Sequence, residues 1–525
     1  MRRSGQITVF LCLILTVILS FLCVCLESAR SAGLRYRLQL AADSSLQSVF
    51  AGYDRILWEK YQLLFCSGGD REGSRIREEM LACASQLGED PSPLSGLDWT
   101  APDVSEVQVS QLVFATDQEG AVFEKAVLDY MKTGSVAILW QELQERLGDG
   151  SKTVAQVVGE SAEKGEFSFA EVEKQYENWK KEAEDAVKTG QENAAESGGE
   201  QTGMEGAAES GGESDRTEEA PVIPQGNVID AVKQLISSGV LALVVENPEK
   251  LSGEPYTWAF CPSEMQADER GRAAENSPVQ ASDGVSNILD TLLFDEYLLR
   301  FLDCYTSDPP QEGTVCQLEY VISGGESDRE NLSEVVHRIL WVREAFNLVY
   351  LLSDSSSRTV AQTAATALVG WTGIPFLVTG LSGLILAAWA YGESLADVRL
   401  LLDGGVVPLR KGKDSWQTSL EGLIHWEKNH QAAKEKDAEG LSYEDYLRLL
   451  LLSAGRGEKC YRAMDMIQQS MERLSPGFRF DCLVYSCEAS LRAENRFRFL
   501  ALPAFQPAEA WGKRQEWEAE TGYHY

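Results

Sequence analysis

The chain has 525 residues, of which 44% are apolar and 12 are tryptophan, so it can supply hydrophobic cores for more than one domain. It carries 81 acidic and 47 basic residues, and its net charge of −34 repels nucleic acid phosphates and anionic lipid headgroups from most of the surface. This composition argues against a nucleic-acid-binding protein and against a wholly disordered chain.

The first predicted element is an apolar helix over residues 7–26, which contain no charged side chain. At about 1.5 Å of rise per residue, twenty residues span roughly 30 Å, the thickness of the hydrocarbon core of a bilayer. The stretch is longer than the apolar part of a signal peptide, and its exit lacks a small-x-small cleavage site. We therefore expect residues 1–26 to remain as a transmembrane anchor and not to be removed.

Small, weakly polar residues recur at every fourth position of this segment: Thr8, Cys12, Thr16 and Ser20. They form one stripe along a helix, where small side chains allow helices to approach closely in lipid and to hydrogen-bond across the contact. We name these four residues the packing stripe. The alternative interpretation is that a spanning helix simply tolerates such residues.

Apolar residues continue beyond the anchor at spacings of three and four, from Leu34 to Leu64, with no proline before the pair Gly68-Gly69. This periodicity predicts an amphipathic helix that continues the anchor as a stalk over residues 27–66. Arginines flank the anchor on both sides, so the count of positive charges does not decide its orientation.

Several segments of the sequence resemble a known family. GQITVF (residues 5–10), the run ending in LESAR and the segment from 38 to 64 resemble the amino terminus of minor-pilin-like proteins of tight-adherence (Tad) pili. More closely, the chain resembles an uncharacterised Gram-positive family similar to TadE and TadG proteins. The further matching segments are EYVISGGESDRENL (319–332), residues 389–402, YLRLLLL (446–452) and MDMIQ (464–468). The resemblance implies an extracytoplasmic membrane protein of a pilus apparatus and carries no established activity.

The resemblance also implies a candidate processing site. Prepilins are cut after a glycine at the cytoplasmic edge of the membrane, and Gly5-Gln6 occupies the matching position. The glutamate usually found five residues after the cut is replaced here by Phe10. In a pilus that glutamate neutralises the new amino terminus of a neighbouring subunit. Its absence argues against processing and fibre incorporation, and favours an anchored accessory protein over a major pilin.

Beyond the stalk we predict a membrane-proximal α+β region (67–187) and a helix-rich α+β region (227–525), whose strands form one antiparallel sheet packed by helices. Alternating apolar residues predict a strand over 106–115, and further strands are predicted over 315–322, 478–487 and 497–502, the last two joined by a turn at 493–495. Ser327 and Glu330 have the spacing of a capping box. Helices are predicted over 121–147, 165–187, 228–245, 284–305, 330–353, 416–436, 442–453 and 458–474.

Residues 188–226 separate these two regions. They contain the sequence AAESGGE twice, nine acidic and two basic residues, and almost no large apolar side chain. Such a composition cannot offset the entropy lost on ordering, so this segment is predicted to be a disordered acidic linker.

Residues 359–392 contain no charge and are long enough to cross a membrane, although five glycine and proline residues interrupt them. One interpretation, which we prefer, is a buried helical hairpin broken at residues 373–375. The other is a second span, which would place residues 393–525 on the opposite side of the membrane. Glu393 and Asp397 follow at a spacing of four, and we interpret them as a solvated helix face and not as an acid–base pair.

Candidate chemistry is sparse elsewhere. Eleven cysteines include eight outside the anchor, where both disulfides and free buried thiols remain open. No CxxC motif occurs, the four histidines are scattered, and nucleotide-binding and hydrolase motifs are missing. We therefore predict no catalytic residue, no cofactor and no metal site.

The sequence predicts a single-pass protein of the bacterial cell membrane whose bulk is extracytoplasmic. On the resemblance, it serves a Tad-like pilus, adhesion or secretion apparatus as a non-catalytic, minor-pilin-like or assembly component. The expected partners are membrane lipid and other pilus or Tad-type assembly proteins, and not nucleic acid. Two alternatives remain: an anchored ectodomain that binds a ligand, and a cell-envelope hydrolase whose site residues are not local in sequence.

Overall fold

The computed structural model describes residues 4–88, 100, 102–133, 228–245, 251–266, 284–307, 316–370, 374–424, 440–495 and 515–525. The chain divides into two compact units. The first contains Met1–Val136, Trp258–Phe301 and Gly455–Tyr525, and the second contains Ala137–Thr257 and Leu302–Ala454. Helices dominate the described residues and one small antiparallel sheet lies in the first unit, so the predicted helix-rich α+β class is confirmed.

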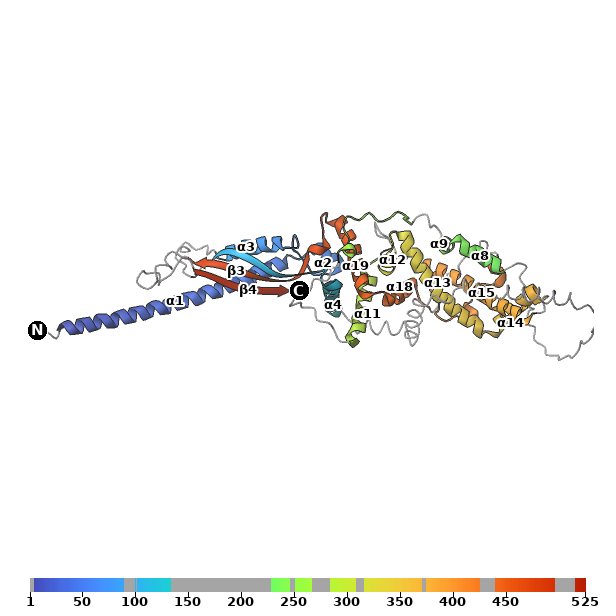
Figure 1. Cartoon of the computed structure of the whole chain (residues 1–525), viewed down its shortest axis with the longest axis horizontal. Coiled ribbons are helices and arrows are strands. Elements are labelled where there is room, and N and C mark those ends of the chain that lie inside the picture. Colours follow the sequence, from blue (N-terminus) through green and yellow to red (C-terminus); the bar gives the residue numbers. More distant parts are fainter. Residues whose placement is uncertain are drawn as a thin grey trace, which may run out of the picture. The chain divides into compact units, whose positions relative to one another are not determined.

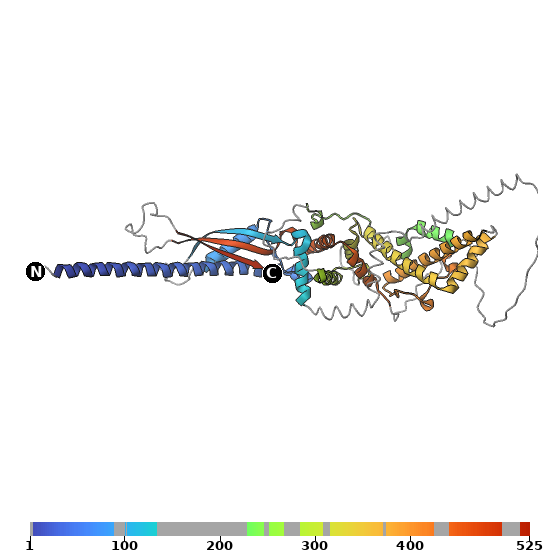
Figure 2. The same cartoon turned by 60° about the horizontal axis from the view of Figure 1, so that its bottom comes forward.

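The anchor and the first part of the stalk form one continuous helix, α1 (Ser4–Ala51). Its 48 residues correspond to a length of roughly 70 Å. Figure 1 and Figure 2 show its amino-terminal half extending beyond the sheet of the first unit, while its carboxy-terminal half runs alongside the strands. The large apolar side chains between Ile7 and Leu26 are all at least 41% exposed. Water cannot solvate such a surface without a large free-energy cost, so this half of α1 is suited to lipid.

The stalk prediction extends too far, because the helix breaks before residue 66. Helix α1 ends at Ala51, and a short helix, α2 (Arg55–Tyr61), follows after a turn. The Asp54 carboxylate accepts a hydrogen bond from the amide of Leu57 at 2.9 Å and so caps a new helix start. At its other end, Gln62 takes a left-handed conformation (φ 57°), which ends α2.

The sheet contains β1 (Cys66–Ser67), β2 (Asp103–Phe114), β3 (Leu483–Asn495) and β4 (Gln515–His524). All pairs are antiparallel, and β3 pairs with each of the other three strands. The register places Val107 of β2 opposite Leu491 of β3, which lies opposite Ala519 of β4. Strands far apart in the sequence therefore form one sheet.

The strand predictions succeed where one face of a strand is polar. The strand predicted over 106–115 is confirmed as β2. The prediction over 478–487 is confirmed only from Leu483, because Phe480–Cys482 form a 3-10 turn, η8, and the predicted turn at 493–495 is wrong because β3 continues to Asn495. The prediction over 315–322 is wrong because this segment forms α12 (Gln317–Ser323). Residues 497–502 lie outside the described residues.

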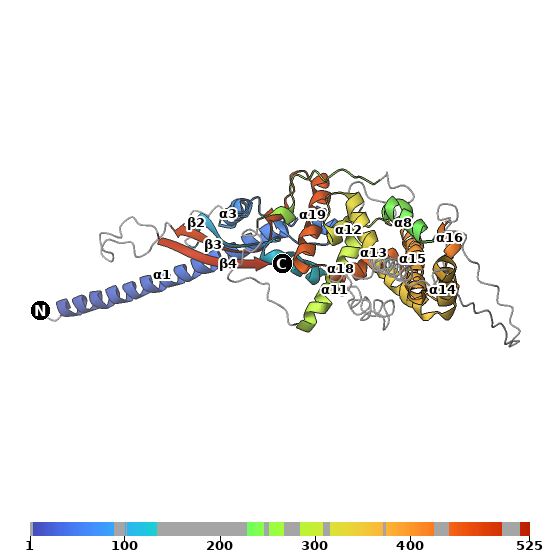
Figure 3. The ribbon, with the colours of Figure 1, turned by 45° about the vertical axis from the view of Figure 1, so that its right-hand side comes forward.

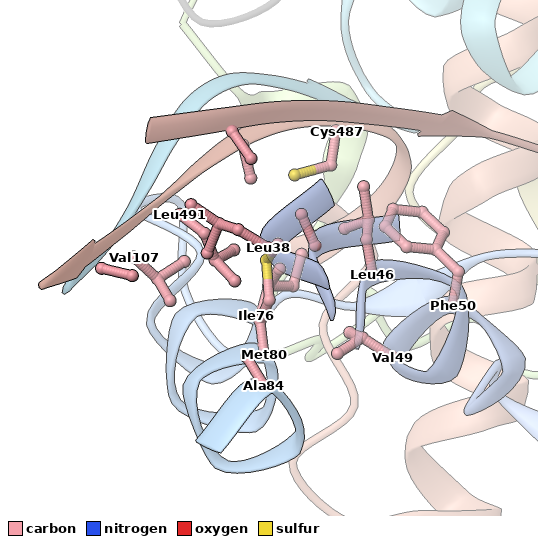
Figure 4. Close-up of a cluster of buried hydrophobic side chains, with 14 of the residues drawn as sticks. Leu38, Leu46, Val49, Phe50, Ile76, Met80, Ala84, Val107, Cys487 and Leu491 are labelled. Carbon is pink, nitrogen blue, oxygen red and sulfur yellow. The ribbon is translucent and has the colours of Figure 1, made fainter. Parts of the chain in front are cut away.

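The core of the first unit forms where α1 and α3 (Ser74–Gly88) cover one face of the sheet. Figure 4 shows Leu38 and Leu46 of α1, Ile76 and Met80 of α3, and Leu491 of β3 converging beneath the strands. Each fully buried side chain of this size contributes about 1.5–3 kcal/mol. The same helix that exposes its apolar first half thus supplies core side chains with its second half.

The rest of the first unit comprises η2 (Gln118–Gly120), α4 (Ala121–Thr133), η5 (Pro262–Glu264), α11 (Gly284–Phe301) and α19 (Arg456–Leu474). Lys459 of α19 pairs with Asp295 of α11 in the interior. Arg456 of α19 pairs with Glu124 of α4 at 2.5 Å. These ion pairs connect helices from three distant parts of the sequence.

The second unit is a helical assembly built around two antiparallel helices, α13 (Asp328–Ser353) and α15 (Pro375–Leu402). The helix α14 (Ser355–Val369) follows α13 after Asp354, whose carboxylate caps it by accepting a hydrogen bond from the Ser357 amide at 2.8 Å. Figure 3 shows α13, α14 and α15 together with α8 and α16. The other elements of the unit are α8 (Val228–Ser238), α9 (Val240–Val244), α12, η7 (Lys413–Ser415), α16 (Leu420–Ile424) and α18 (Tyr443–Ser453).

Most helix predictions match these elements. The predictions over 330–353, 442–453 and 458–474 are confirmed by α13, α18 and α19, and that over 284–305 by α11, which ends at Phe301. The prediction over 228–245 is split because Gly239, at φ 84°, separates α8 from α9. The described parts of 121–147 and 416–436 are helical over 121–133 and 420–424, and the remainder of 121–147 and residues 425–436 lie outside the described residues. Residues 165–187 and the linker 188–226 also lie outside them.

The apolar segment 359–392 forms part of a helical hairpin. Helix α14 ends at Val369 and α15 begins at Pro375, so the break predicted at residues 373–375 lies at the start of α15. The side chains of α15 from Leu384 onward are almost all buried inside the second unit. The capping box is half confirmed: Ser327 accepts a hydrogen bond from the Glu330 amide at 3.3 Å, whereas the Glu330 carboxylate bonds the amide of Glu326.

Replacing Leu38 with alanine tests the double role of α1. Leu38 is 1% exposed in the core beneath the sheet, whereas Leu40, two residues later, is 54% exposed. We expect Leu38→Ala to lower the free energy of unfolding by about 2–5 kcal/mol, through lost burial and a cavity. Leu40→Ala, the matched control, should change it by about 0.5 kcal/mol or less. Urea unfolding of the detergent-solubilised protein measures both, and equal losses would contradict the assignment of α1 to the core.

Candidate functional site

Two helices among the described residues are long and apolar enough to cross a membrane: Ile7–Ala51 within α1, and α15. They differ in their surroundings. The most apolar window of α1 is not buried at all, whereas 56% of the corresponding window of α15 is buried inside the protein. The apolar part of α1 therefore has the surface of a membrane anchor, while α15 serves largely as a core helix of the second unit.

The packing stripe predicted on α1 borders a shallow hollow of about 350 Å³. Thr8, Cys12 and Thr16 line the hollow together with Val9 and Leu13, and Ser20 lies one helical turn further on. The hydroxyl of Thr16 donates to the carbonyl of Leu13 at 2.8 Å, and that of Ser20 donates to the carbonyl of Val17 at 2.9 Å. Because these donors bond within the helix, the stripe offers close approach to another helix more than strong hydrogen bonds to it.

The candidate processing bond between Gly5 and Gln6 lies in the first turn of α1, which begins at Ser4. Phe10, which replaces the usual glutamate of prepilins, belongs to the exposed apolar surface of the same helix. The structure thus places the candidate bond at the amino-terminal edge of the apolar surface.

Glu393 and Asp397 do not form the solvated face that their position after an apolar run suggests. Both side chains are fully buried, at 0% exposure. They lie on the part of α15 that packs against α13, and two buried cations from elsewhere in the sequence face them. The interpretation from sequence is wrong because a helix-spaced pair of carboxylates carries no signal of distant partners.

The Asp397 carboxylate lies between Arg343 of α13 and Lys411 of the loop after α15. Arg343 contacts it at 2.9 Å and Lys411 at 2.5 Å. The amide of Asn347 also donates to Asp397, at 3.0 Å, and to the hydroxyl of Ser394, at 2.9 Å. The remaining guanidinium donors of Arg343 bond two loop carbonyls, Asn347 and the Tyr446 hydroxyl.

Glu393 joins the same network one helical turn earlier. Its carboxylate pairs with Lys411 and accepts hydrogen bonds from the backbone amides of Gln417, at 3.0 Å, and Thr418, at 2.7 Å. The hydroxyl of Thr418 adds a further bond at 2.7 Å. The loop that follows α15 is thereby fastened to the helix from which it departs.

This four-charge network, Arg343, Glu393, Asp397 and Lys411, is balanced and enclosed. Burial alone would lower the pKa of Arg343, but Asp397 and Tyr446 outweigh burial and raise it. All four charged side chains are buried, and each cation is paired with an anion. The role of the network in the described geometry is to hold α13, α15 and the loop together.

The second unit also contains an open groove of about 1200 Å³. One wall is formed by α9 and the end of α8, and another by the loop 323–325 and the amino-terminal half of α13. Glu330, Glu334, His337 and Trp341 line it from α13, at successive spacings of four, three and four residues. They therefore share one face of that helix. The groove combines carboxylates, the arginines Arg329 and Arg338, an imidazole and aromatic and aliphatic side chains, which suits a ligand with both polar and apolar parts.

Asn331 holds the loop of the groove in place. Its side-chain oxygen accepts hydrogen bonds from the Ser323 hydroxyl at 2.5 Å and the Gly325 amide at 2.7 Å, and its amide donates to the Tyr256 hydroxyl at 2.9 Å. A Cβ atom on Gly325 would lie 2.9 Å from the Asn331 oxygen, so a larger residue would displace this contact. The loop 323–325 is thus held against Asn331 of α13 and forms one wall of the groove.

A buried carboxylate, Glu319, lies behind this loop on α12. One oxygen accepts hydrogen bonds from the amide of Tyr305 at 2.9 Å and the hydroxyl of Tyr443 at 2.8 Å. The other oxygen has no hydrogen-bond partner in the described part of the chain. Burial raises the pKa of Glu319 to about 7, and the two hydrogen bonds offset only part of that effect.

Sequence reasoning missed the groove and the four-charge network. The segment 319–332 carries a family resemblance, but no local pattern in it assigns its loop, its buried glutamate or its helix face to a site. The available signal was the repeated polar spacing from Glu330 to Trp341 next to a Gly-Gly pair. The network carries no local signal, since Arg343 lies 54 residues before Asp397 and Lys411 lies beyond the end of α15.

No group of histidine, cysteine or acidic side chains in the described ranges is arranged to hold a metal ion. All eleven cysteines belong to those ranges and are free thiols. Burial raises the pKa of Cys66 to about 11 and that of Cys487 to about 12, so both thiols stay protonated at neutral pH. Of the two alternatives for these residues, the structure has free thiols.

These features define a helix-rich α+β protein with an amino-terminal helix suited to a membrane anchor. Residues 218–495 match the model of a family of unknown function, DUF5702, and the chain belongs to this family. No curated protein and no solved structure matches the chain.

Removing one charge from the four-charge network should be costly. Lys411→Met leaves Glu393 and Asp397 buried with less compensating charge, and we expect it to lower the free energy of unfolding by about 3–5 kcal/mol. The control is Arg338→Met, which breaks the exposed pair with Glu334 and should cost about 1 kcal/mol or less. Denaturant unfolding measures both values. Similar small losses would mean that the network adds little to stability.

The raised pKa of Glu319 predicts a pH-dependent stability. A proton bound to the folded protein contributes stability below pH 4.5, the value for an exposed glutamate, and this contribution is lost as the pH rises through about 7. Glu319→Gln does not titrate, so its stability relative to the native protein should improve between pH 4 and pH 8 by up to about 3 kcal/mol. Glu326→Gln, at an exposed position, is the control. If both variants show the same pH profile in denaturant unfolding, Glu319 does not titrate as inferred.

Proposed function

We propose that this protein is a membrane-anchored, extracytoplasmic component of a Tad-like pilus, adhesion or secretion apparatus, with a minor-pilin-like or assembly role. In this proposal α1 is retained as a single span in the bacterial cell membrane and the bulk of the chain lies outside. The proposal involves no bond chemistry. Its expected partners are membrane lipid and other proteins of the apparatus.

The continuity of α1 is the observation that carries this proposal. A single helix exposes apolar side chains from Ile7 to Leu26 and then buries Leu38, Leu46 and Phe50 beneath the sheet. Because helix α1 has no break between these two halves, movement of its apolar half is transmitted directly to the sheet and α3, which pack on its other half. Such rigid coupling suits an assembly component that positions its first unit at the membrane surface.

Lateral association supplies the second part of the argument. The hollow beside Thr8, Cys12 and Thr16 leaves room for the side chains of a neighbouring helix within the membrane. Small residues at such a contact favour close packing in lipid, where the hydrophobic effect gives no help. We propose that the packing stripe is the contact by which α1 meets another spanning helix of the apparatus.

The open groove favours a second candidate function, an anchored ectodomain that binds a ligand. Its volume of about 1200 Å³ exceeds that of usual small-molecule pockets, and its lining joins Trp341 to several carboxylates. A soluble ligand bound there would be compatible with the same anchor. Ligand binding by the groove and assembly through the packing stripe therefore involve different surfaces.

The proposed orientation is tested by adding protease to intact cells. If the bulk lies outside, we expect the full-length band to disappear from intact cells while a cytoplasmic marker protein remains uncut. An antibody raised against the second unit detects the chain in an immunoblot. Protection in intact cells, followed by cleavage after lysis, would place the bulk in the cytoplasm and reject the proposal.

Filling the hollow tests the packing stripe. Replacing Thr8, Thr16 and Ser20 with leucine should lower the yield of helix–helix crosslinking through the native thiol of Cys12, because larger side chains prevent close approach. Cys23 and Cys25 are changed to serine in every sample. The control replaces Phe10, Val17 and Phe21, on the opposite face, with leucine. Equal yields for both triple variants would reject the stripe as a contact surface.

A further inference from the structure

The junction of α14 and α15 exposes apolar side chains, whereas α15 is almost wholly buried from Leu384 onward. Leu368, near the end of α14, is 42% exposed, and Phe376, in the first turn of α15, is 52% exposed. Pro375 is exposed beside them, and Val369 and Ile374 are half-buried. We call these five residues the hairpin tip.

The sequence on either side of the hairpin tip is uncharged over at least nine residues. The nearest charges are Arg358, ten residues before Leu368, and Glu393, seventeen residues after Phe376. At 1.5 Å per helical residue these separations are about 15 Å and about 25 Å. In a chain with a net charge of −34, so long an uncharged stretch is distinctive. Its lack of charge matches hydrocarbon and does not match the anionic headgroup layer.

The hydroxyl groups next to the hairpin tip bond to their own helices. Thr363 donates to the carbonyl of Thr359 at 2.8 Å, and Thr366 donates to that of Gln362 at 2.7 Å. On α15, Thr379 donates to the carbonyl of Pro375 at 3.2 Å. A lipid-facing polar group needs such an internal partner because hydrocarbon supplies none. Thr16 and Ser20 of α1 show the same arrangement.

The depth of any membrane contact is limited by the packing of α15. Its side chains are almost all buried within the second unit from Leu384 onward, and the four-charge network locks Glu393 and Asp397 to their partners. Moving this half of the helix into lipid would break that network. Only the first turns of α15 and the last turn of α14 are available, which corresponds to an insertion of about 5–10 Å.

We propose that the hairpin tip inserts into the boundary between headgroups and acyl chains of a phospholipid bilayer, as a shallow membrane contact in addition to α1. Burial of one leucine and one phenylalanine is too weak to hold a free protein on a membrane. It suffices when α1 already keeps the chain at the surface, because tethering turns the second contact into an intramolecular event. This contact does not depend on a role in a pilus.

Lipid fits the hairpin tip better than a protein partner does. Specific protein contacts use charged or hydrogen-bonding groups at their rim to fix orientation. The described residues of the hairpin tip are apolar, and Thr366 and Thr379 beside them direct their hydroxyl donors inward to the backbone. Such a surface provides apolar burial without directional recognition, as a bilayer requires.

Photolabelling of the full-length protein tests the proposal. The protein is reconstituted in vesicles of phosphatidylglycerol and phosphatidylcholine that contain a phosphatidylcholine with a diazirine in its acyl chain. After illumination and digestion, mass spectrometry locates the lipid adducts. We expect adducts on the apolar half of α1, the internal positive control, and on Leu368 or Phe376. Val349 and Leu352, which are 65% and 50% exposed on α13, should carry none and serve as the negative control.

Two matched double variants sharpen the result. Leu368→Asp with Phe376→Asp should lower labelling of the hairpin tip by about tenfold and leave labelling of α1 unchanged, since a charge in the acyl boundary is strongly disfavoured. Val349→Asp with Leu352→Asp introduces the same charge elsewhere on the second unit and should leave labelling of the tip unchanged. Labelled α1 without a labelled tip in the native protein would overturn the proposal. Adducts that continue along α15 to Ala390 would overturn it too, because they indicate a second span.

Discussion

The architecture of the first unit depends on one helix that meets two different surroundings. The first half of α1 presents apolar side chains on all sides. Only lipid or a tightly packed partner can accommodate such a surface. Its second half presents one apolar face to the sheet and to α3. This helix sets the position of the sheet relative to the apolar first half of α1, because α1 is continuous from Ser4 to Ala51.

In the second unit the corresponding constraint is electrostatic. Burying Glu393 and Asp397 would be prohibitive without Arg343 and Lys411, and the network exists only when α13, α15 and the following loop are all in place. Such a requirement selects one packing of apolar helices that could otherwise slide past one another. The buried network also distinguishes α15 from an ordinary spanning helix, whose apolar surface would face lipid along its whole length.

The elements that sequence predicts well are those in which a local pattern determines the environment. The uncharged run of α1 and the half-polar alternation of β2 are examples. Residues 317–322 show the opposite case, because their side chains are buried on every side and a short apolar run does not distinguish a strand from a buried helix. The four-charge network and the groove escape local patterns, since both join segments that lie far apart in the chain.

The order of the strands along the chain has a consequence for biogenesis. Helix α1 is synthesised first, but the strands that cover it, β3 and β4, come from residues 483–524. The hydrogen bond from the Gln39 side chain to the Glu520 carbonyl joins residues 481 positions apart, and closing so long a loop is slow. Until the ribosome has made these strands, Leu38 and Leu46 of α1 can pack against α3 but lack the sheet that completes their cover. The core beneath the sheet therefore closes late in synthesis.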